Sequence, residues 1–221
     1  MIKCCIFDLD GTLYFTLDSI RYFLNKTLVN YGIEPITSEE CRIFVGNGAR
    51  NLLERCLDSR SVTDRSNFEV MYKEYTEDYD ANATYLTVPY DGIVELLDGL
   101  KELGVKLAVL SNKPDPTTKR AVAELSPGTF DVVYGARTGV ALKPDPEAVT
   151  GILAELGVSA SETVFIGDTG TDITTGKNFG ARATVGVAWG YRSKEELARA
   201  GADFVADTPR EILDFIKDKL S

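Results

Sequence analysis

The 221-residue chain is long enough for one large α/β domain or for a domain that carries a smaller inserted one. It holds 24 Lys and Arg against 34 Asp and Glu, a formal net charge of −10. So acidic a surface repels nucleic-acid backbones and anionic lipid, which are therefore not expected as partners. The sequence contains no His, which excludes Ser-His-Asp and Cys-His catalysis, His-ligated zinc and a His general base. Any catalysis must use carboxylates, Lys, hydroxyls, Cys or a bound metal.

The four cysteines, Cys4, Cys5, Cys41 and Cys56, form no C-x-x-C pair. Reduced and mostly buried thiols are a better interpretation than a zinc site or disulfides. The adjacent Cys4 and Cys5 lie in an apolar run, so their side chains should point to opposite faces of a strand. The N-terminus has no signal-peptide profile, and no apolar stretch approaches the roughly 18 residues that a membrane span needs. We expect a cytoplasmic protein, either a monomer or a homodimer.

The N-terminal part of the chain predicts one strand followed by helices. An apolar run over residues 2–7 stops at a turn-like acidic sequence and indicates a buried strand. Apolar residues then recur every three or four positions from Ile20 to Tyr31, which is typical of an amphipathic helix, and Gly32 ends it. Further helical patterns cover residues 38–44, 51–57 and 68–79. No strand is expected between about residues 16 and 83.

Beyond residue 89 the pattern alternates between helix and strand. The predicted helices cover residues 93–103, 117–125, 146–156, 172–179 and 209–220. The predicted strands cover residues 105–110, 132–134, 163–167 and 183–187. Such alternation implies βαβ units and a parallel sheet with helices on both faces. The predicted fold is a doubly wound, Rossmann-like α/β core, built from residues 1–15 and 84–221, with an all-helical domain inserted at residues 16–83.

The first candidate site is the sequence Asp8-Leu9-Asp10-Gly11-Thr12, directly after the first predicted strand. Residues i and i+2 of an extended chain point the same way, so Asp8 and Asp10 can face one spot, roughly 6–7 Å apart. Two like charges so close tend to divide their roles, one staying ionised and the other being pushed toward protonation. That division suits a nucleophile and an acid, and the carboxylate oxygens also suit a hard divalent cation. The alternative interpretation is an ordinary acidic turn.

Three more polar sites lie at predicted strand ends or beside prolines. Ser111 and Asn112 could hold phosphate oxygens or could simply form a turn. Lys143, followed by two closely spaced prolines, fits a point charge that neutralises an anion, or else a solvated Lys. Asp168 ends a strand and Asp172 opens a helix, where it also fits an N-cap. These two carboxylates would repel the first acidic pair unless a cation lay between them, which predicts a Mg²⁺ site.

Taken in this order, the four motifs resemble those of the haloacid dehalogenase-like phosphatases. The matching segments are Asp8-Leu9-Asp10-Gly11-Thr12, Ser111-Asn112, Lys143 and Gly167-Asp168 through Asp172. The resemblance runs over essentially the whole chain. The segments Val45-Gly46-Asn47-Gly48, Leu110-Ser111-Asn112-Lys113-Pro114 and Lys143-Pro144-Asp145-Pro146 are most similar to the phosphoglycolate phosphatase subgroup.

This resemblance implies a Mg²⁺-dependent phosphatase that acts on a small phosphoester. Asp8 would attack the phosphorus and form an aspartyl-phosphate. Asp10 would protonate the leaving alcohol and then activate water, with Thr12 helping to orient it. Lys143 would hold both the phosphate and Asp8. The inserted helices would form a cap that closes over the site and excludes water.

The resemblance also implies the binding residues. Mg²⁺ would be held by Asp8, the backbone carbonyl of Asp10 and Asp168, with Asp172 in support. The substrate would be bound by residues of both the core and the cap. The expected substrate-binding residues are Thr12, Ser111 and Asn112 from the core, and Gly48 and Arg50 from the cap.

Several features of the cap and hinge leave the substrate open. Tyr14-Phe15-Thr16 stands where many relatives have an acidic residue and Ser, close to the hinge. Gly46-Asn47-Gly48 lacks the third glycine of a dinucleotide fingerprint, so a cap loop near the substrate is the better interpretation. Arg50 either meets an anionic group of the leaving alcohol or is a solvated surface Arg. Tyr72, Tyr75 and Tyr79 fit a packed cap face better than a stacking platform, and Trp189 fits a packing role.

Two alternative functions remain open on the sequence alone. One is a phosphomutase or phosphotransferase, in which a second substrate hydroxyl takes the phosphoryl group in place of water. The other is a catalytically silent phosphate-binding regulator, which the intact motifs disfavour because such a protein needs neither Asp8 nor Asp10. A dehalogenase is disfavoured too, since it needs no acid at the position of Asp10.

Overall fold

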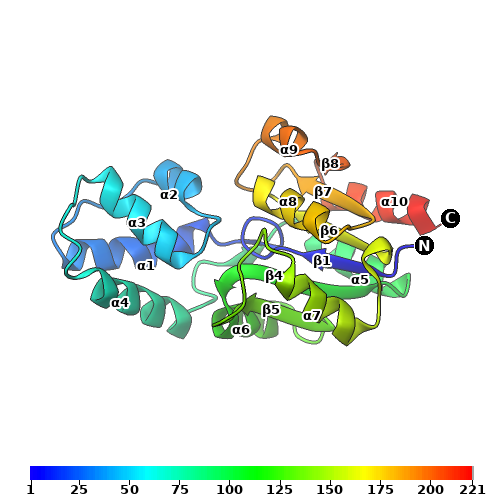
Figure 1. Cartoon of the computed structure of the whole chain (residues 1–221), viewed down its shortest axis with the longest axis horizontal. Coiled ribbons are helices and arrows are strands. Elements are labelled where there is room, and N and C mark those ends of the chain that lie inside the picture. Colours follow the sequence, from blue (N-terminus) through cyan, green and yellow to red (C-terminus); the bar gives the residue numbers. More distant parts are fainter. Residues whose placement is uncertain (221) are drawn as a thin grey trace.

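The computed structural model describes residues 1–220 and confirms the predicted α/β fold. Its main sheet has six parallel strands in the order β5-β4-β1-β6-β7-β8 (Figure 1). The strands are β1 (Cys4–Phe7), β4 (Lys106–Pro114), β5 (Val132–Ala136), β6 (Thr163–Gly167), β7 (Ala183–Val187) and β8 (Phe204–Ala206). The first strand lies at the centre, with later strands added outward on both sides. Ligands of such sheets bind beyond the carboxyl ends of the strands.

The central strand β1 is buried on both faces, as the apolar run predicted. Cys5 and Phe7 pack into one hydrophobic cluster, and Cys4 and Ile6 pack into the other. This alternation confirms that the two adjacent cysteines face opposite sides. A strand with core on both faces is enclosed by helices, which is why it contains no polar residue before Asp8.

Helices cover both faces of the sheet. The cluster that contains Cys5 includes residues of α5 (Ile93–Glu102), α6 (Asp115–Leu125) and α10 (Pro209–Leu220). The cluster that contains Cys4 includes residues of α7 (Glu147–Leu156), and α8 (Gly170–Asn178) packs on the same side through Gly176 against Phe165. The short helices η1 (Ala160–Glu162) and α9 (Lys194–Ala200) complete the core.

Four helices form a separate unit after β1, which we call the cap. They are α1 (Leu17–Asn30), α2 (Ser38–Phe44), α3 (Ala49–Ser59) and α4 (Phe68–Ala81), and they share a hydrophobic cluster of their own. Cys41 and Cys56 are buried in that cluster, as expected. Two short antiparallel strands, β2 (Tyr14–Phe15) and β3 (Val88–Pro89), connect the cap to the core. Figure 1 places the cap at the end of the sheet opposite both termini, beyond the carboxyl end of β1.

The structure corrects the sequence prediction at strand β4 and at several elements that were not predicted. Strand β4 continues past residue 110 to Pro114, so Ser111 and Asn112 lie within the strand and not after it. Its pairing with β5 shifts register between Leu110 and Pro114, an irregularity that frees this end of the strand from regular pairing. The prediction missed α9 and four elements of at most three residues each, η1, β8, β2 and β3.

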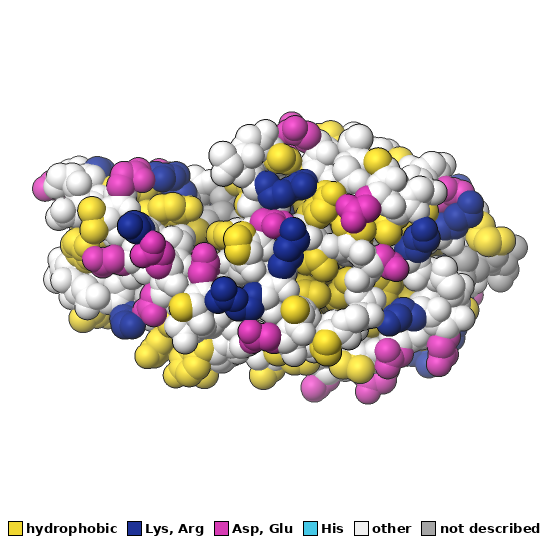
Figure 2. Space-filling view, turned by 90° about the horizontal axis from the view of Figure 1, so that it is seen from below, with side chains coloured by type: hydrophobic (Ala, Val, Ile, Leu, Met, Phe, Trp, Pro, Cys, Tyr) yellow, Lys and Arg dark blue, Asp and Glu magenta, His cyan; other side chains and the backbone are white. Residues whose placement is uncertain are grey.

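The surface mixes charges of both signs. On the face seen in Figure 2, Lys and Arg side chains lie interspersed with Asp and Glu side chains. Within residues 1–220, no helix combines the length and the hydropathy needed to cross a lipid bilayer.

Candidate active site

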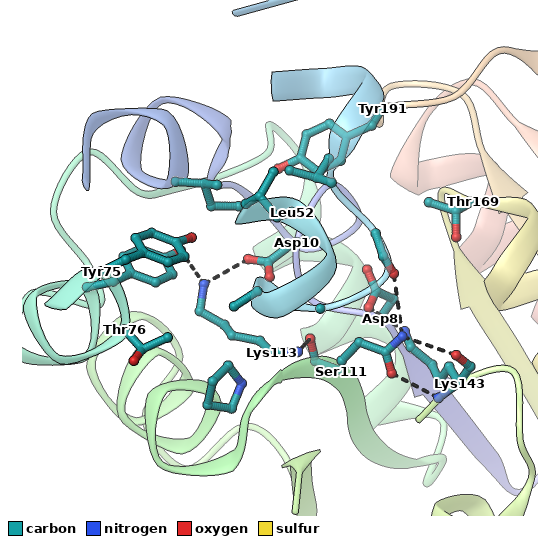
Figure 3. A pocket seen from close by; sticks show the side chains of 18 of the residues that line it. Asp8, Asp10, Leu52, Tyr75, Thr76, Ser111, Lys113, Lys143, Thr169 and Tyr191 are labelled. Carbon is teal, nitrogen blue, oxygen red and sulfur yellow. Dashed lines mark hydrogen bonds and ion pairs between the residues drawn. The ribbon is translucent and has the colours of Figure 1, made fainter. Parts of the chain in front are cut away.

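Four charged side chains meet beyond the carboxyl ends of β1 and β6. Asp8 follows β1, and its backbone N–H donates to Ile166 O of β6 at 2.9 Å. Asp168 follows β6, and Asp172 lies in the first turn of α8. Lys143 Nζ reaches into this group and lies 2.5 Å from Asp8 Oδ1 and 2.8 Å from Asp172 Oδ1 (Figure 3). The predicted convergence of residues far apart in sequence is therefore present in the structure.

Asp8, Asp168 and Asp172 form what we call the acidic cluster. One carboxylate oxygen from each lies within 4.8 Å of the others, and all three residues are buried. Thr12 is placed between two of them: its Oγ1 donates to Asp168 Oδ1 at 3.3 Å and lies 3.5 Å from Asp8 Oδ2. We had expected Thr12 to orient Asp10, whereas its hydroxyl contacts the acidic cluster.

Backbone groups fix the other two acids of the cluster. Tyr191 donates its backbone N–H to Asp168 Oδ2 at 2.7 Å. The side chain of Asp172 accepts from Thr169 N at 3.0 Å and from Thr169 Oγ1 at 2.6 Å, which closes a capping box at the start of α8. Asp172 is therefore a helix-capping residue and a partner of Lys143 at the same time.

Close packing requires glycine beside the cluster. A Cβ on Gly11, whose φ is +92°, would lie 2.4 Å from Asp168 Oδ2. A Cβ on Gly190 would lie 2.2 Å from Asp168 Cβ, and one on Gly167 would lie 2.3 Å from Asp172 Cβ. These contacts are shorter than any real side chain tolerates, so the backbone can approach the acids only as glycine.

The cluster carries more negative charge than Lys143 balances. Burial raises the pKa of Asp8 to about 7, although Lys143 opposes the rise, and Asp172 adds to it. Burial and then the charge of Asp8 raise the pKa of Asp168 well above its usual range. Burial disfavours the ammonium form of Lys143, but Asp172 and Asp8 outweigh that effect and raise its pKa. Ionised carboxylates in this position need further positive charge.

Asn112 holds the backbone of Lys143. Its Oδ1 accepts from Lys143 N at 2.9 Å, and its Nδ2 donates to Lys143 O at 3.2 Å. The same Nδ2 lies 3.4 Å from the carbonyl oxygen of Gly46 in the cap. The sequence predicts that Asn112 binds phosphate, and the structure shows that its side chain also positions the lysine. Ser111, its neighbour, lines the cavity described next.

Asp10 points away from the acidic cluster. Its Oδ1 lies 3.1 Å from Lys113 Nζ, and Figure 3 shows Asp8 and Asp10 directed to different lysines. Asp8 and Asp10 both line the cavity described next, but they pair with different lysines, because the chain leaves its extended conformation after Phe7. The turn that follows, with Leu13 N donating to Leu9 O at 3.0 Å, rotates Asp10 toward the cap.

A cavity of about 80 Å³ lies between the core and the cap. Its core side is formed by Asp8, Asp10, Ser111, Asn112, Lys113, Lys143, Thr169 and Asp172. Its cap side is mostly apolar or aromatic and includes Ile20, Val45, Gly48, Leu52, Tyr75 and Tyr79. The site therefore has a charged floor and an apolar roof, and it has the size for a small molecule.

The comparison with known proteins identifies this arrangement. Residues 5–186 match the haloacid dehalogenase-like hydrolases. The chain belongs to that family. It is 33% identical over 213 residues to a phosphoglycolate phosphatase of Aquifex aeolicus, covering 96% of this chain and 95% of the relative. It is also 32% identical over 225 residues to an N-acetylmuramic acid 6-phosphate phosphatase of Pseudomonas aeruginosa, covering 97% and 95%.

A solved structure agrees with this assignment. A protein of Haemophilus somnus, described as a predicted phosphoglycolate phosphatase, superposes with a TM-score of 0.90 at 25% identity. The match covers 97% of this chain and 98% of the other. The predicted family and the predicted enzyme class, a phosphatase, are thereby confirmed.

Not every substrate-binding residue that the sequence predicts lines the cavity. Gly48 lines it, but Arg50 is not among the lining residues. The Arg50 guanidinium instead pairs with Glu69 at 2.7 Å and lies over the rings of Phe68 and Tyr72, with 47% of its side chain exposed. Because Arg50 lies in the first turn of α3, its side chain reaches the neighbouring α4 and not the cavity.

The sequence does not predict that Lys113, Tyr191, Tyr75 and Tyr79 line the cavity. Lys113 directly follows Ser111 and Asn112 in the sequence, but its position depends on the extension of β4, which the sequence does not predict. Tyr191 follows β7 by several residues and carried no signal beyond its aromatic type. Tyr75 and Tyr79 were expected to pack in the cap; they are buried there, with rings 5.9 Å apart, and they also line the cavity.

Proposed function

We propose that the chain is a Mg²⁺-dependent phosphatase that hydrolyses a small phosphorylated metabolite of the phosphoglycolate type, through an aspartyl-phosphate on Asp8. The observation that carries the proposal is the meeting of Asp8, Lys143 and two further acids at the floor of a small cavity. The names of the Aquifex and Pseudomonas relatives support the substrate type. We further propose a cytoplasmic location, which the four unpaired thiols support.

The acidic cluster fits a hard divalent cation. It offers three buried carboxylate oxygens, the ligand type that Mg²⁺ prefers, and it holds more negative charge than Lys143 neutralises. Asp8, Asp168 and Asp172 would hold the ion, together with the Asp10 backbone carbonyl that the family resemblance implies. Bound Mg²⁺ would neutralise part of the negative charge on the phosphoryl oxygens and on Asp8.

The protein residues divide the reaction between them. An Asp8 oxygen attacks phosphorus and forms the new P–O bond, while the bond from phosphorus to the alcohol oxygen breaks. Asp10 gives a proton to that oxygen, and the alcohol leaves. Asp10 then takes a proton from a water molecule that attacks phosphorus, which releases phosphate and regenerates the Asp8 carboxylate. Lys143 neutralises charge beside Asp8 throughout, because it is fixed there by Asp172 and by Asn112.

The cavity lining supports a small substrate that carries an anion at its far end. Among the described residues that line the cavity, the cations are Lys143 at the floor and Lys113 beside the cap. An 80 Å³ space leaves room for a few heavy atoms beyond a phosphoryl group. A large sugar phosphate would need the cap to move.

Phosphate release from a panel of phosphorylated metabolites tests the proposal. We expect release from 2-phosphoglycolate that depends on added Mg²⁺ and stops with EDTA. Acid-quenched enzyme should carry phosphate on Asp8, detectable by mass spectrometry of the borohydride-reduced peptide. Release that persists in EDTA, or label on another residue, would contradict the proposal.

A further inference from the structure

We propose that Lys113 is the specificity-determining residue, which binds a carboxylate on the leaving alcohol and makes the enzyme selective for phosphoesters of hydroxy acids. This inference rests on the proposed function and deepens it. Lys113 belongs to the last part of β4, on the cavity wall between Asp10 and the cap. Its side chain is only 3% exposed, so its charge is directed into the site and not into solvent.

The ammonium group of Lys113 has an unused donor in the closed cavity. Its Nζ lies 3.1 Å from Asp10 Oδ1 and donates to the hydroxyl of Tyr79, over whose ring it also lies at 4.3 Å. An ammonium has three N–H donors, and these two contacts use two of them. Burial, followed by the charge of Asp10, raises the pKa of Tyr79 well above its usual range, so the phenol stays neutral and balances no charge.

The rest of the cavity offers a substrate anion no comparable partner. Lys143 is committed to Asp8 and Asp172 at the phosphoryl end. The cap contributes apolar and aromatic side chains and the acid Asp80, and Arg50 faces away. A second anion on the substrate would therefore be repelled everywhere except at Lys113. There it would gain a charge-assisted hydrogen bond in a site shielded from water.

Matched substrates separate this role from catalysis. 2-Phosphoglycolate and 2-hydroxyethyl phosphate differ in having a carboxylate or a hydroxymethyl group at the far end. We expect the wild-type enzyme to prefer phosphoglycolate in kcat/KM by about 10–100-fold, the range of one charge-assisted hydrogen bond. Lys113→Met should abolish that preference, chiefly through the KM for phosphoglycolate. Lys113 also contacts Asp10, so the variant slows both substrates through that contact, and this common loss cancels in the ratio of the two kcat/KM values. The control is Lys119→Met, an exposed lysine on α6.

The possible outcomes are distinct. If the wild-type enzyme hydrolyses neither compound, the proposed function itself fails. If it hydrolyses both equally well, or if Lys113→Met slows both equally, the phosphatase stands and the role of Lys113 as a carboxylate ligand is refuted. Lys113→Arg keeps the positive charge and should retain part of the preference; a complete loss would also count against the inference. Comparing the two substrates with the wild-type enzyme alone can already refute the inference. The test therefore remains decisive even if a variant does not fold.

A second observation, independent of the first, concerns the contact between the cap and the core. Arg192 follows β7 in the core, and its guanidinium donates to the carbonyl oxygens of Arg42 at 2.5 Å, Ile43 at 3.3 Å and Val45 at 2.9 Å. These carbonyls end α2, where a helix leaves acceptors without partners of its own. In return, Arg42 Nη1 donates to Tyr191 O at 2.6 Å.

We infer that this arginine pair is a positioning device for the catalytic cavity. The carbonyls that Arg192 binds lead directly into Val45, Gly46 and Gly48, which line the cavity. On the core side, Tyr191 donates its backbone N–H to Asp168, and its hydroxyl lies 2.8 Å from Thr16 Oγ1 at the start of the cap. Two adjacent residues, Tyr191 and Arg192, thus contact the acidic cluster, the start of the cap and the cap loop.

Hydrogen exchange tests the arginine pair without reference to activity. Arg192→Ala should speed exchange in α2 and residues 45–48 while leaving the central sheet unchanged. It should also raise KM for 2-phosphoglycolate by about tenfold, with a smaller change in kcat. Arg42→Ala removes only the hydrogen bond to Tyr191 O and keeps the carbonyls that Arg192 binds, so it should give a smaller change of the same kind. Arg199→Ala, an exposed arginine of α9, is the control.

Two results would overturn this inference. One is exchange in α2 and residues 45–48 that stays as slow as in the wild type. The other is faster exchange throughout the sheet, which would show that Arg192 stabilises the core itself. If Arg192→Ala does not fold, Arg192→Lys must show the local increase, since one ammonium cannot hold the same set of carbonyls in a planar fork.

Discussion

Replacing the proposed nucleophile should make the metal-free protein more stable while it destroys activity. Asp8→Asn keeps the shape of the side chain and removes its charge. In the folded protein, burial raises the pKa of Asp8 to about 7 from an ordinary value of 3.8. Folding therefore favours protonated Asp8, so its contribution to stability is fully present below about pH 4 and is lost as pH rises through about 7.

The size of the effect follows from that difference. About three pKa units correspond to about 4 kcal/mol at pH 8, which is an upper bound because the folded protein relaxes around the charge. We expect Asp8→Asn to gain about 2 kcal/mol or more at pH 8 in EDTA, and clearly less at pH 5, where wild-type Asp8 is mostly protonated. Lys143 keeps its ion pair with Asp172 in the variant, so it is not left without a partner.

Urea unfolding followed by circular dichroism measures this gain. The assay compares wild type, Asp8→Asn and the exposed control Asp98→Asn at both pH values in EDTA. With Mg²⁺ added, the wild type should regain stability through binding, and Asp8→Asn should gain less. Turnover of 2-phosphoglycolate by the variant should fall to background. If Asp8→Asn is less stable than the wild type at pH 8 in EDTA, the charge argument for the acidic cluster is wrong.

Other changes probe the surroundings of the site. Asn112→Ala removes two hydrogen bonds to the Lys143 backbone, so kcat should fall at least about tenfold with intact circular dichroism; unchanged kcat would show that Lys143 is placed by other contacts. Gly167→Ala should cost about 1–3 kcal/mol in urea unfolding because its Cβ overlaps Asp172, whereas Gly170→Ala, with its nearest neighbour at 3.5 Å, should cost little. Burial raises the pKa of Cys4, Cys41 and Cys56 to about 12, so Ellman's reagent at pH 8 should find no reactive thiol until denaturant exposes all four.

The parts of the fold that the sequence predicts well are those in which burial decides the pattern. The run Cys4–Phe7 has to be apolar because the core covers both of its faces, and β6 and β7 match their predicted ranges for the same reason. Helix α2 is also predicted without error, since Thr37 and Glu40 form a capping box at its start. In these elements the local sequence pattern, either an apolar run or a capping box, specifies the same secondary structure as the complete fold.

The directions of individual side chains at the site depend on contacts that no local rule contains. Asp10 turns toward Lys113 because the chain bends after β1, and Lys113 reaches it because β4 runs on to Pro114. Arg50 could bind an anion, as arginines commonly do, yet Glu69 and the aromatic rings of α4 hold its side chain at the surface. Each outcome is set by a neighbour on a different element, so a pattern along the chain cannot reveal it.

The positions of the two lysines explain how so acidic a protein can accept an anionic substrate. A net charge of −10 repels a phosphate dianion over most of the surface. Binding therefore depends on local positive charge, and the protein buries Lys143 and Lys113 at opposite ends of one cavity. Each lysine is paired with an acid of the proposed mechanism, Asp8 for the first and Asp10 for the second. Each pairing holds one ammonium group at the cavity wall, so a substrate with two anionic groups would meet a positive charge at each of them.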